Sequence, residues 1–190
     1  MISPYETDVK HCVTTMKNNG VILYPTDTIW GLGCDAHNVQ AIEKIFDIKK
    51  RDKHKSFVLL MTDVRQLSKY LANPIPDLES IVEKFTCPTT VIYDNAINLP
   101  DKVLGSDGSV AVRITKDPFC RSLIKRLRSP IVSTSANLSG EPSAAIFSHI
   151  DKKIIEACDY VVKWRQDDEK AAQPSSILKL KADWSFVKIR

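Results

Sequence analysis

The sequence predicts a single α/β domain built on a twisted, mixed sheet with flanking helices. Short apolar runs, which are typical of buried strands, alternate along the chain with longer segments whose apolar residues recur at helical spacing. A length of 190 residues suits one domain with a sizeable core. With 43% hydrophobic and 26% charged residues, the composition lies in the ordinary globular range.

Charge and cysteine usage narrow the classes of function. A net charge of +4 suits an anionic ligand or weak RNA contact better than strong binding of duplex nucleic acid. The five cysteines are scattered, with no CxxC pair and no zinc-ligand spacing, so we expect reduced thiols and no metal site. There is no apolar leader and no run of eighteen apolar residues. We therefore expect no signal peptide, no membrane span and a cytoplasmic location.

Helices are expected where apolar residues recur every three or four positions between capping residues. Asp117 followed by Pro118 is the clearest start signal, because aspartate favours the N-cap and proline the first helical position. Ser148 is expected to cap the last helix. The expected helices span residues 8–19, 39–50, 63–71, 77–85, 117–128 and 148–158.

Strands are expected at apolar runs bounded by turn residues. They cover residues 21–24, 56–61, 89–93, 109–115, 160–164, 176–180 and 184–189, with another strand starting at residue 131. After the first strand, Thr26, Asp27 and Thr28 lead to two glycines, Gly31 and Gly33, which we interpret as a polar loop at the sheet edge. Ligands bind at such places in α/β folds, although an Asx-type turn produces the same pattern.

The segment from Ile131 to Gly140 begins as a buried strand and continues into small hydroxyl residues. Side chains alternate along an extended chain, so Ser133, Ser135 and Asn137 fall on one face. This row predicts one polar wall of a binding site. A serine-rich turn whose hydroxyls cap backbone groups is the alternative.

A basic segment follows the second expected helix. Lys49 continues the apolar stripe of that helix, so its ammonium either reaches solvent at the helix end or points into a cleft that holds an anion. Five positive charges fall within seven residues, at Lys49, Lys50, Arg51, Lys53 and Lys55. Such a run is also typical of a solvated helix end.

The strand at residues 109–115 has one apolar face and one face of small polar residues around Arg113. An edge strand with a solvated face would give the same alternation, but such faces usually carry several long charged residues. We therefore favour an arginine that points into a cavity.

Four segments together resemble the YrdC-like family of L-threonylcarbamoyladenylate synthases, in order, from about residue 9 to the end of the chain. They are Tyr24-Pro-Thr-Asp-Thr-Ile-Trp-Gly-Leu-Gly33, Lys49-Lys-Arg51, Ser109-Val-Ala-Val-Arg-Ile-Thr115 and Ser133-Thr-Ser-Ala-Asn-Leu-Ser-Gly140. The resemblance implies a YrdC-like domain over residues 1–190 with a basic concave cavity. We expect no separate C-terminal domain of the kind that some relatives carry.

The resemblance also implies a reaction. L-threonine, bicarbonate and ATP would give threonylcarbamoyl-AMP and pyrophosphate, with Mg²⁺ entering with ATP and held chiefly by phosphates and water. The product would pass to the machinery that makes threonylcarbamoyladenosine in tRNA. The sequence shows no convincing Ser/His/Asp set or carboxylate pair, so we expect neither a covalent nucleophile nor a protein general base.

Positions that match the family imply roles for twelve residues. Lys49 and Arg51 would be catalytic. The threonine side would comprise Thr28, Arg113, Ser133 and Ser175, and the ATP side Arg51, Lys55, Ser109, Ser135, Asn137, Ser143 and Arg190. The apolar segment 184–189 would dock as a strand and carry Arg190 to the site, whereas a solubilising terminal charge is the alternative.

The chain departs from the family pattern at several positions. Thr86-Cys87-Pro88 replaces a proline-glycine-proline turn, Gln173 stands where glycine is common, Asp52 replaces a proline, and Leu60 stands where some members have a histidine. A non-enzymatic RNA-binding module is the alternative function, but aromatic residues make up only 7% of the chain. A different carbamoyl source, as in domains of hydrogenase maturation proteins, is the second enzymatic alternative.

Overall fold

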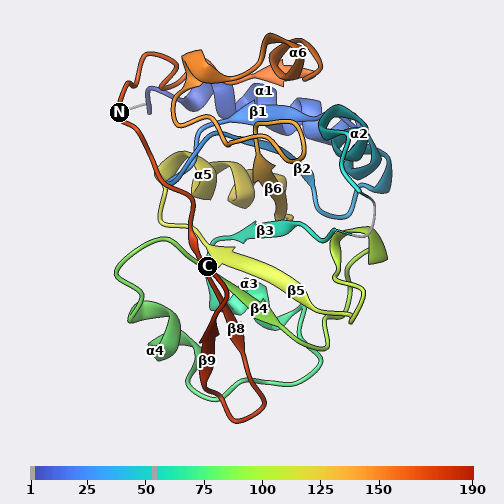
Figure 1. Ribbon diagram of the computed structural model, residues 1–190, viewed down its shortest axis with the longest axis vertical. Coiled ribbons are helices and arrows are strands. Elements are labelled where there is room, and N and C mark those ends of the chain that lie inside the picture. The colour runs from blue at the N-terminus through green and yellow to red at the C-terminus, as the bar shows by residue number, and fades with distance from the viewer. Residues whose placement is uncertain (1–2, 53–54) are drawn as a thin grey trace.

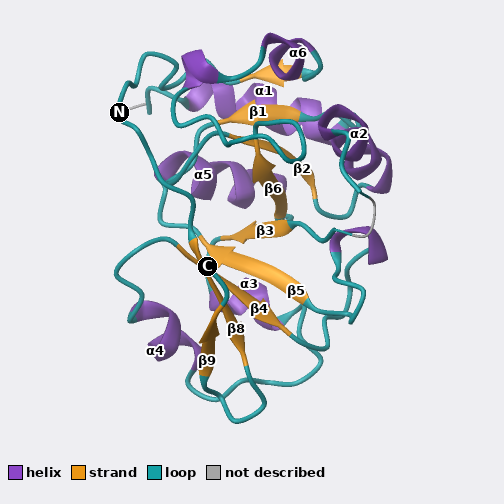
Figure 2. Ribbon diagram, in the orientation of Figure 1, coloured by secondary structure: helices purple, strands orange, loops and turns teal. Residues whose placement is uncertain are grey.

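A computed structural model describes residues 3–52 and 55–190; Lys53 of the basic segment lies outside them. The strands of the described residues form one mixed sheet in the order β7-β1-β2-β6-β3-β5-β4-β8-β9. They are β1 Ile22–Tyr24, β2 Gly31–Asp35, β3 Val58–Met61, β4 Thr89–Tyr93, β5 Val110–Ile114, β6 Ile131–Ser135, β7 Tyr160–Val161, β8 Ser176–Leu180 and β9 Phe186–Lys188. Strand direction turns through the sheet from β1 to β8 (Figures 1 and 2). The prediction of a twisted, mixed α/β sheet is confirmed.

The helices flank this sheet. They are α1 Glu6–Lys17, α2 Val39–Lys49, α3 Val64–Ser68, α4 Leu78–Glu83, α5 Pro118–Leu127 and α6 Lys152–Glu156, with 3₁₀ turns at Asp101–Val103 and Phe147–His149. Asp117 caps α5 as predicted, since its side chain accepts a hydrogen bond from the Cys120 amide at 2.9 Å.

The prediction that Ser148 caps the last helix is wrong. The chain first makes a 3₁₀ turn, and the side chain of Asp151 then accepts a hydrogen bond from the Lys153 amide. Aspartate at the start of α6 therefore satisfies the free amide that the serine was expected to satisfy. The helix is correspondingly short.

The expected loop around Gly31 and Gly33 is also wrong, because these residues begin strand β2. This strand pairs antiparallel with β1 and with β6. A Cβ atom on Gly33 would lie 2.6 Å from Cε1 of Tyr24 and 2.8 Å from the carbonyl oxygen of Val132. The glycine is required by the tyrosine ring packed against the strand, and not by a turn.

Strand β6 occupies the middle of the sheet, antiparallel to both of its neighbours. Its first residues, Ile131 and Val132, are fully buried, and Ser133 lies opposite Gly33 on one side and Val58 on the other. Apolar residues thus fix the strand in the core before its hydroxyl residues begin.

The end of the chain is held inside the fold. Strand β9 pairs with β8, and beyond it Arg190 and Ile177 exchange backbone hydrogen bonds of 3.1 and 3.2 Å. The C-terminus therefore lies near the middle of the molecule in Figure 1. Trp184 was expected in this strand, but it lies in the preceding turn with a φ of 65° and is 44% exposed.

All five cysteines have free thiols, as expected. Among the described residues, no helix has both the length and the apolar character needed to cross a membrane.

Candidate active site

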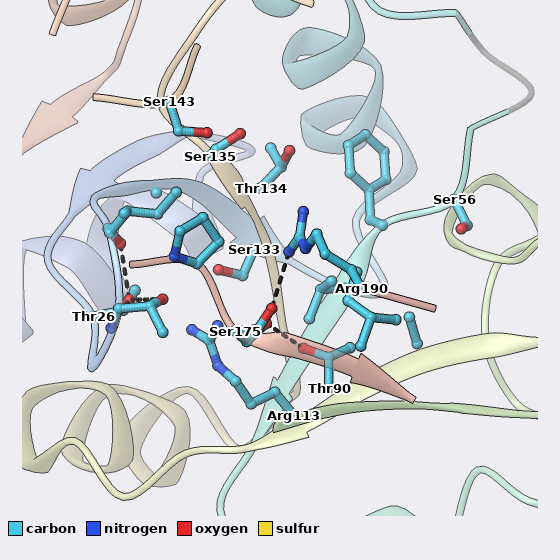
Figure 3. A pocket seen from close by; sticks show the side chains of 18 of the residues that line it. Thr26, Ser56, Thr90, Arg113, Ser133, Thr134, Ser135, Ser143, Ser175 and Arg190 are labelled. Atoms are coloured by element: carbon cyan, nitrogen blue, oxygen red, sulfur yellow. Dashed lines mark hydrogen bonds between the residues drawn. The ribbon is translucent and has the colours of Figure 1, made fainter. Parts of the chain in front are cut away.

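A cavity of about 330 Å³ opens on one face of the sheet (Figure 3). Val58 of β3 lines it, and strands on both sides of β3 contribute further side chains. They include Thr90 and Ile92 of β4, Ala111 and Arg113 of β5, and Ser133 and Ser135 of β6. Val112 and Ile114 line a different cavity, on the opposite face.

Three arginines line this cavity: Arg51, Arg113 and Arg190. No aspartate or glutamate of residues 3–52 or 55–190 is among its lining residues. The remaining polar lining consists of hydroxyl side chains, which can donate to or accept from a ligand. The cavity is therefore suited to an anionic ligand.

Arg113 points into the cavity from an interior strand. Strand β5 lies between β3 and β4, so the edge-strand alternative is excluded. The side chain is only 7% exposed, and its Nη2 atom lies 3.2 Å from Oδ1 of Asp27. Thr115 donates to the other carboxylate oxygen of Asp27 at 3.2 Å. An ion pair thus orients this guanidinium while it remains at the cavity wall.

Arg51 contacts a backbone carbonyl and an aromatic ring, and the charge of Asp52 also acts on it. Its Nη2 atom donates to the carbonyl oxygen of Ser56 at 2.7 Å, and its guanidinium carbon lies 5.1 Å from the centre of the Phe57 ring. Burial lowers the pKa of this guanidinium from its usual value. Arginine is so basic that it keeps its charge at neutral pH.

Lys49 is 1% exposed, and it neither reaches solvent nor lines the cavity. Its ammonium donates to the carbonyl oxygen of Ser135 and, at 2.6 Å, to that of Asn137. The Lys49 carbonyl accepts a hydrogen bond from the Ser139 amide. Burial, reinforced by the charge of Arg51, lowers the pKa of Lys49 to about 8. The lysine thus fastens the end of β6, which forms one wall of the cavity.

The terminal arginine reaches the same cavity. Its Nη2 atom donates to the carbonyl oxygen of Ser175 at 3.1 Å. The Ser175 hydroxyl lies 2.8 Å from the hydroxyl of Thr90, which is fully buried on β4 (Figure 3). Arg190 is exposed to solvent and also lines the cavity.

Threonine hydroxyls shape the turn between β1 and β2. Thr26 Oγ1 lies 2.9 Å from Thr28 Oγ1, accepts from the Thr28 amide and donates to the Ile29 carbonyl at 2.8 Å. In the alternative of an Asx-type turn Asp27 would cap this turn, but its carboxylate pairs with Arg113.

Eight of the twelve predicted site residues line the cavity: Thr28, Arg51, Arg113, Ser133, Ser135, Ser143, Ser175 and Arg190. In Figure 3, Arg113 lies on the opposite side of the cavity from Ser135 and Ser143. Arg113 of the predicted threonine group thus lies apart from these two serines of the predicted ATP group, whereas Arg190 of the ATP group contacts Ser175 of the threonine group.

The other four residues lie outside the lining. Lys49 holds the wall, as described above, and Lys55 is exposed. Ser109 is buried beside the Gly105 turn, and its amide donates to Asp107. The Asn137 amide group donates to the carbonyl oxygens of Leu138 and Glu141, so it does not extend the row of serines.

Sequence reasoning assigned no site role to Asp27, Phe57 or Thr90. Asp27 belongs to the segment 24–33 that resembles the family, so its position in that segment could have indicated a role at the site. Phe57 and Thr90 belong to strand segments of ordinary composition, and their relation to Arg51 and Ser175 exists only in the folded chain.

The fold and the cavity together define an α/β protein that presents arginines and hydroxyl groups on one face of a mixed sheet. The sequence model of the Sua5, YciO and YrdC proteins, described as "Telomere recombination", matches residues 14–190. The chain therefore belongs to this family.

Curated relatives share this assignment. The threonylcarbamoyl-AMP synthase of Pseudoalteromonas translucida (strain TAC 125) is 32% identical over 160 residues, which cover 83% of this chain and 86% of the relative. The threonylcarbamoyl-AMP synthase of Saccharophagus degradans is 37% identical over 134 residues, or 70% of each protein.

Solved structures have the same fold. The Sua5 protein of P. abyssi in complex with L-threonine matches with a TM-score of 0.84 at 21% identity, over 97% of this chain. This chain spans only 54% of that protein. YciO of E. coli matches with a TM-score of 0.83 at 23% identity, over 99% of this chain and 90% of YciO.

Proposed function

We propose that this protein is a threonylcarbamoyl-AMP synthase, a nucleotidyltransferase that joins L-threonine, bicarbonate and ATP. The main support is a cavity lined by three arginines and several hydroxyls without a lining carboxylate among the described residues. Each of the three substrates contains at least one anionic group that a guanidinium can bind, so such a cavity can hold them together. The names of the curated relatives support the same reaction.

The chemistry requires positioning more than covalent catalysis. Bicarbonate dissociates into carbon dioxide and hydroxide. The neutral amine of threonine adds to the carbon dioxide to form a carbamate, and the proton that it loses joins the hydroxide to give water. A carbamate oxygen then attacks the α-phosphorus of ATP, and the bond to pyrophosphate breaks. Holding the reactants together and stabilising the spreading phosphate charge are the tasks left to the protein.

The two ends of the cavity suit different substrates. At one end, we assign Arg113 to the threonine carboxylate, because a guanidinium can pair with both oxygens of a carboxylate. Thr28, Ser133 and Ser175 would supply hydrogen bonds to the same amino acid. This end is the one at which Asp27 already orients the arginine.

At the other end, we assign Arg51 and Arg190 to the phosphates of ATP, with hydroxyl contacts from Ser135 and Ser143. We also propose that Lys55 and Ser109 contact ATP, although neither residue lines the cavity. Lys49 and Asn137 act in this proposal through the loop that follows β6, where their hydrogen bonds lie.

Magnesium would arrive with ATP. No group of three or more potential metal-ligating side chains occurs in the described parts of the chain. Phosphates and water would therefore supply most of its ligands, as is common for this ion. The product would pass to a tRNA threonylcarbamoyl-transferase in the cytoplasm.

Pyrophosphate release from ATP tests the proposal when each substrate is left out in turn. We expect release with threonine and bicarbonate together, without RNA, and a fall to background when either one is omitted. Release that is unchanged without threonine would contradict the proposed function. It would instead favour an adenylating enzyme with another acceptor.

A further inference from the structure

A second cavity, of about 550 Å³, adjoins the arginine-lined one. The two share four lining residues, Thr26, Thr28, Trp30 and Pro174. The second cavity is otherwise bounded by the loop between β7 and β8, by Cys87 and Pro88, and by Ala145 and Ile146. Asp27 also lines the second cavity and orients Arg113, whereas the other residues that line only this cavity have no role in the site described above.

The second cavity adjoins one end of the site. Among the predicted site residues only Thr28 lines both cavities, and it belongs to the threonine end. Figure 3 places Thr26 across the cavity from Ser56, whose carbonyl holds Arg51. The second cavity therefore leads to the threonine end from the side away from Arg51.

Charge distinguishes the two cavities. Arg165 and Lys170 contribute two positive charges to the lining of the second cavity, and Asp27 and Asp168 contribute two negative ones. The first cavity has three arginines and no carboxylate in its described lining. A balanced lining does not attract a polyanion such as ATP, but it suits a zwitterionic amino acid, whose ammonium and carboxylate both find partners.

The outer wall of the second cavity is a strap, residues 166–174, that crosses from β7 to β8 (Figure 1). In the part of the chain that the structure describes, residues 169–174 make no backbone-to-backbone hydrogen bond. At one end Arg165 binds the Asp117 carboxylate and the Thr26 carbonyl, and at the other Ser175 contacts Thr90. The strap is thus fastened at its ends and free to yield between them.

We propose that the second cavity is the entrance through which L-threonine, as a zwitterion, reaches the Arg113 end of the site. This inference rests on the proposed function. The nucleotide would occupy the Arg51 and Arg190 end and would not need this route. Threonine could then associate while ATP is already bound.

The test narrows the second cavity from its exposed wall. Ala171 lies on the strap, is exposed and lines the cavity, so Ala171→Trp adds bulk without disturbing the core. We expect the KM for threonine to rise at least about tenfold while the KM for ATP stays within about twofold of wild type. Ala182→Trp, at an exposed position outside both cavities, is the matched control and should change neither KM.

A natural cysteine gives a second measurement. Cys87 is exposed and lines the same cavity, whereas Cys12, Cys34 and Cys120 are buried. Alkylation with a bulky maleimide should slow threonine association with the enzyme bound to a non-hydrolysable ATP analogue. Cys87→Ser should remove this sensitivity.

The proposed entrance would be contradicted if threonine kinetics stayed at wild-type values both in Ala171→Trp and after alkylation. Equal changes in the KM for threonine and the KM for ATP would also contradict it. Failure of the proposed function looks different, because the unmodified wild-type protein would then release no pyrophosphate in response to threonine.

Discussion

Two arginines that line one cavity are held in different ways. Arg51 rests on an aromatic ring and a backbone carbonyl, which are neutral partners. Arg113 pairs with a carboxylate, Asp27, that is itself fixed by the hydroxyl of Thr115. A ring and a carbonyl position the first arginine, on which the charge of neighbouring Asp52 also acts, whereas a direct ion pair orients the second.

This difference suits two kinds of ligand. A polyphosphate carries several charges and binds most strongly to cations whose charge is not already neutralised. Recognition of a single carboxylate depends more on hydrogen-bond geometry than on the total positive charge. A guanidinium that is already paired is held in a fixed orientation and can supply that geometry. The contrast therefore assigns charge stabilisation to the Arg51 end and amino acid recognition to the Arg113 end.

Replacing Arg51 should have the largest effect. Charge-assisted hydrogen bonds contribute roughly 1.5 to 3 kcal/mol each, so Arg51→Ala should lower kcat/KM for ATP by at least about tenfold. Thermal unfolding should remain cooperative. Lys125→Ala, which removes an exposed charge from α5, serves as the control and should behave as wild type. Wild-type kinetics in Arg51→Ala would contradict a role in ATP binding and would favour the alternative, in which the basic segment is a solvated helix end.

The next largest effect is expected at the opposite end. Lysine keeps the positive charge of Arg113 but cannot form a bidentate pair with a carboxylate. Arg113→Lys should therefore raise the KM for threonine about tenfold or more and leave the KM for ATP nearly unchanged. Equal increases in the KM for threonine and the KM for ATP would contradict the assignment of Arg113 to threonine alone.

The buried lysine predicts a dependence on pH. The pKa of Lys49 is lowered to about 8, so its ammonium loses a proton as the pH rises through that value. ATP affinity measured by calorimetry should therefore weaken several-fold between about pH 7 and about pH 9. In Lys49→Met this additional loss should disappear. An identical pH profile in the two proteins would show that Lys49 does not act on ATP binding.

The titration of Lys49 does not itself destabilise the fold, because its own contribution to stability changes in the opposite direction. Between about pH 8 and its ordinary pKa of 10.5, Lys49 binds fewer protons in the folded than in the unfolded protein. Its contribution to the free energy of unfolding therefore rises with pH in this window, since stability rises wherever the unfolded state binds more protons.

The smallest effect is expected at the chain end. Deleting Arg190 removes one cation from the cavity, its hydrogen bond to the Ser175 carbonyl and its two backbone hydrogen bonds with Ile177 at the chain end. ATP affinity should fall a few-fold in calorimetry, while threonine affinity and thermal stability stay close to wild type. Equal losses of both affinities and of stability would mean that the residue serves folding alone.

Local patterns in the sequence predicted most of the fold. The strands Thr89–Tyr93 and Ser176–Leu180 were predicted to the residue, because apolar runs with clear boundaries allow few alternatives. Strand β2 was missed because Gly31 and Gly33 resemble a loop. The tyrosine ring that requires a glycine there comes from a neighbouring strand.

The site was predictable in its residues but not in its pairings. Motif positions identified Arg51, Arg113 and Ser175, which the structure brings to one cavity. The partners of these residues could not be inferred in the same way. Asp27 is far from Arg113 in the sequence, and so is Thr90 from Ser175. Pairings of this kind follow from strand order, which local periodicity does not determine.

The most direct test of the central proposal is whether carbon from bicarbonate is incorporated into the product. The protein would be incubated with ATP, L-threonine and ¹³C-labelled bicarbonate, and the products identified by mass spectrometry. We predict a labelled adenylate that contains threonine, one carboxyl carbon from bicarbonate and AMP. An unlabelled threonyl adenylate, or AMP without any threonine adduct, would contradict the proposal, because the nucleophile would then not be a carbamate.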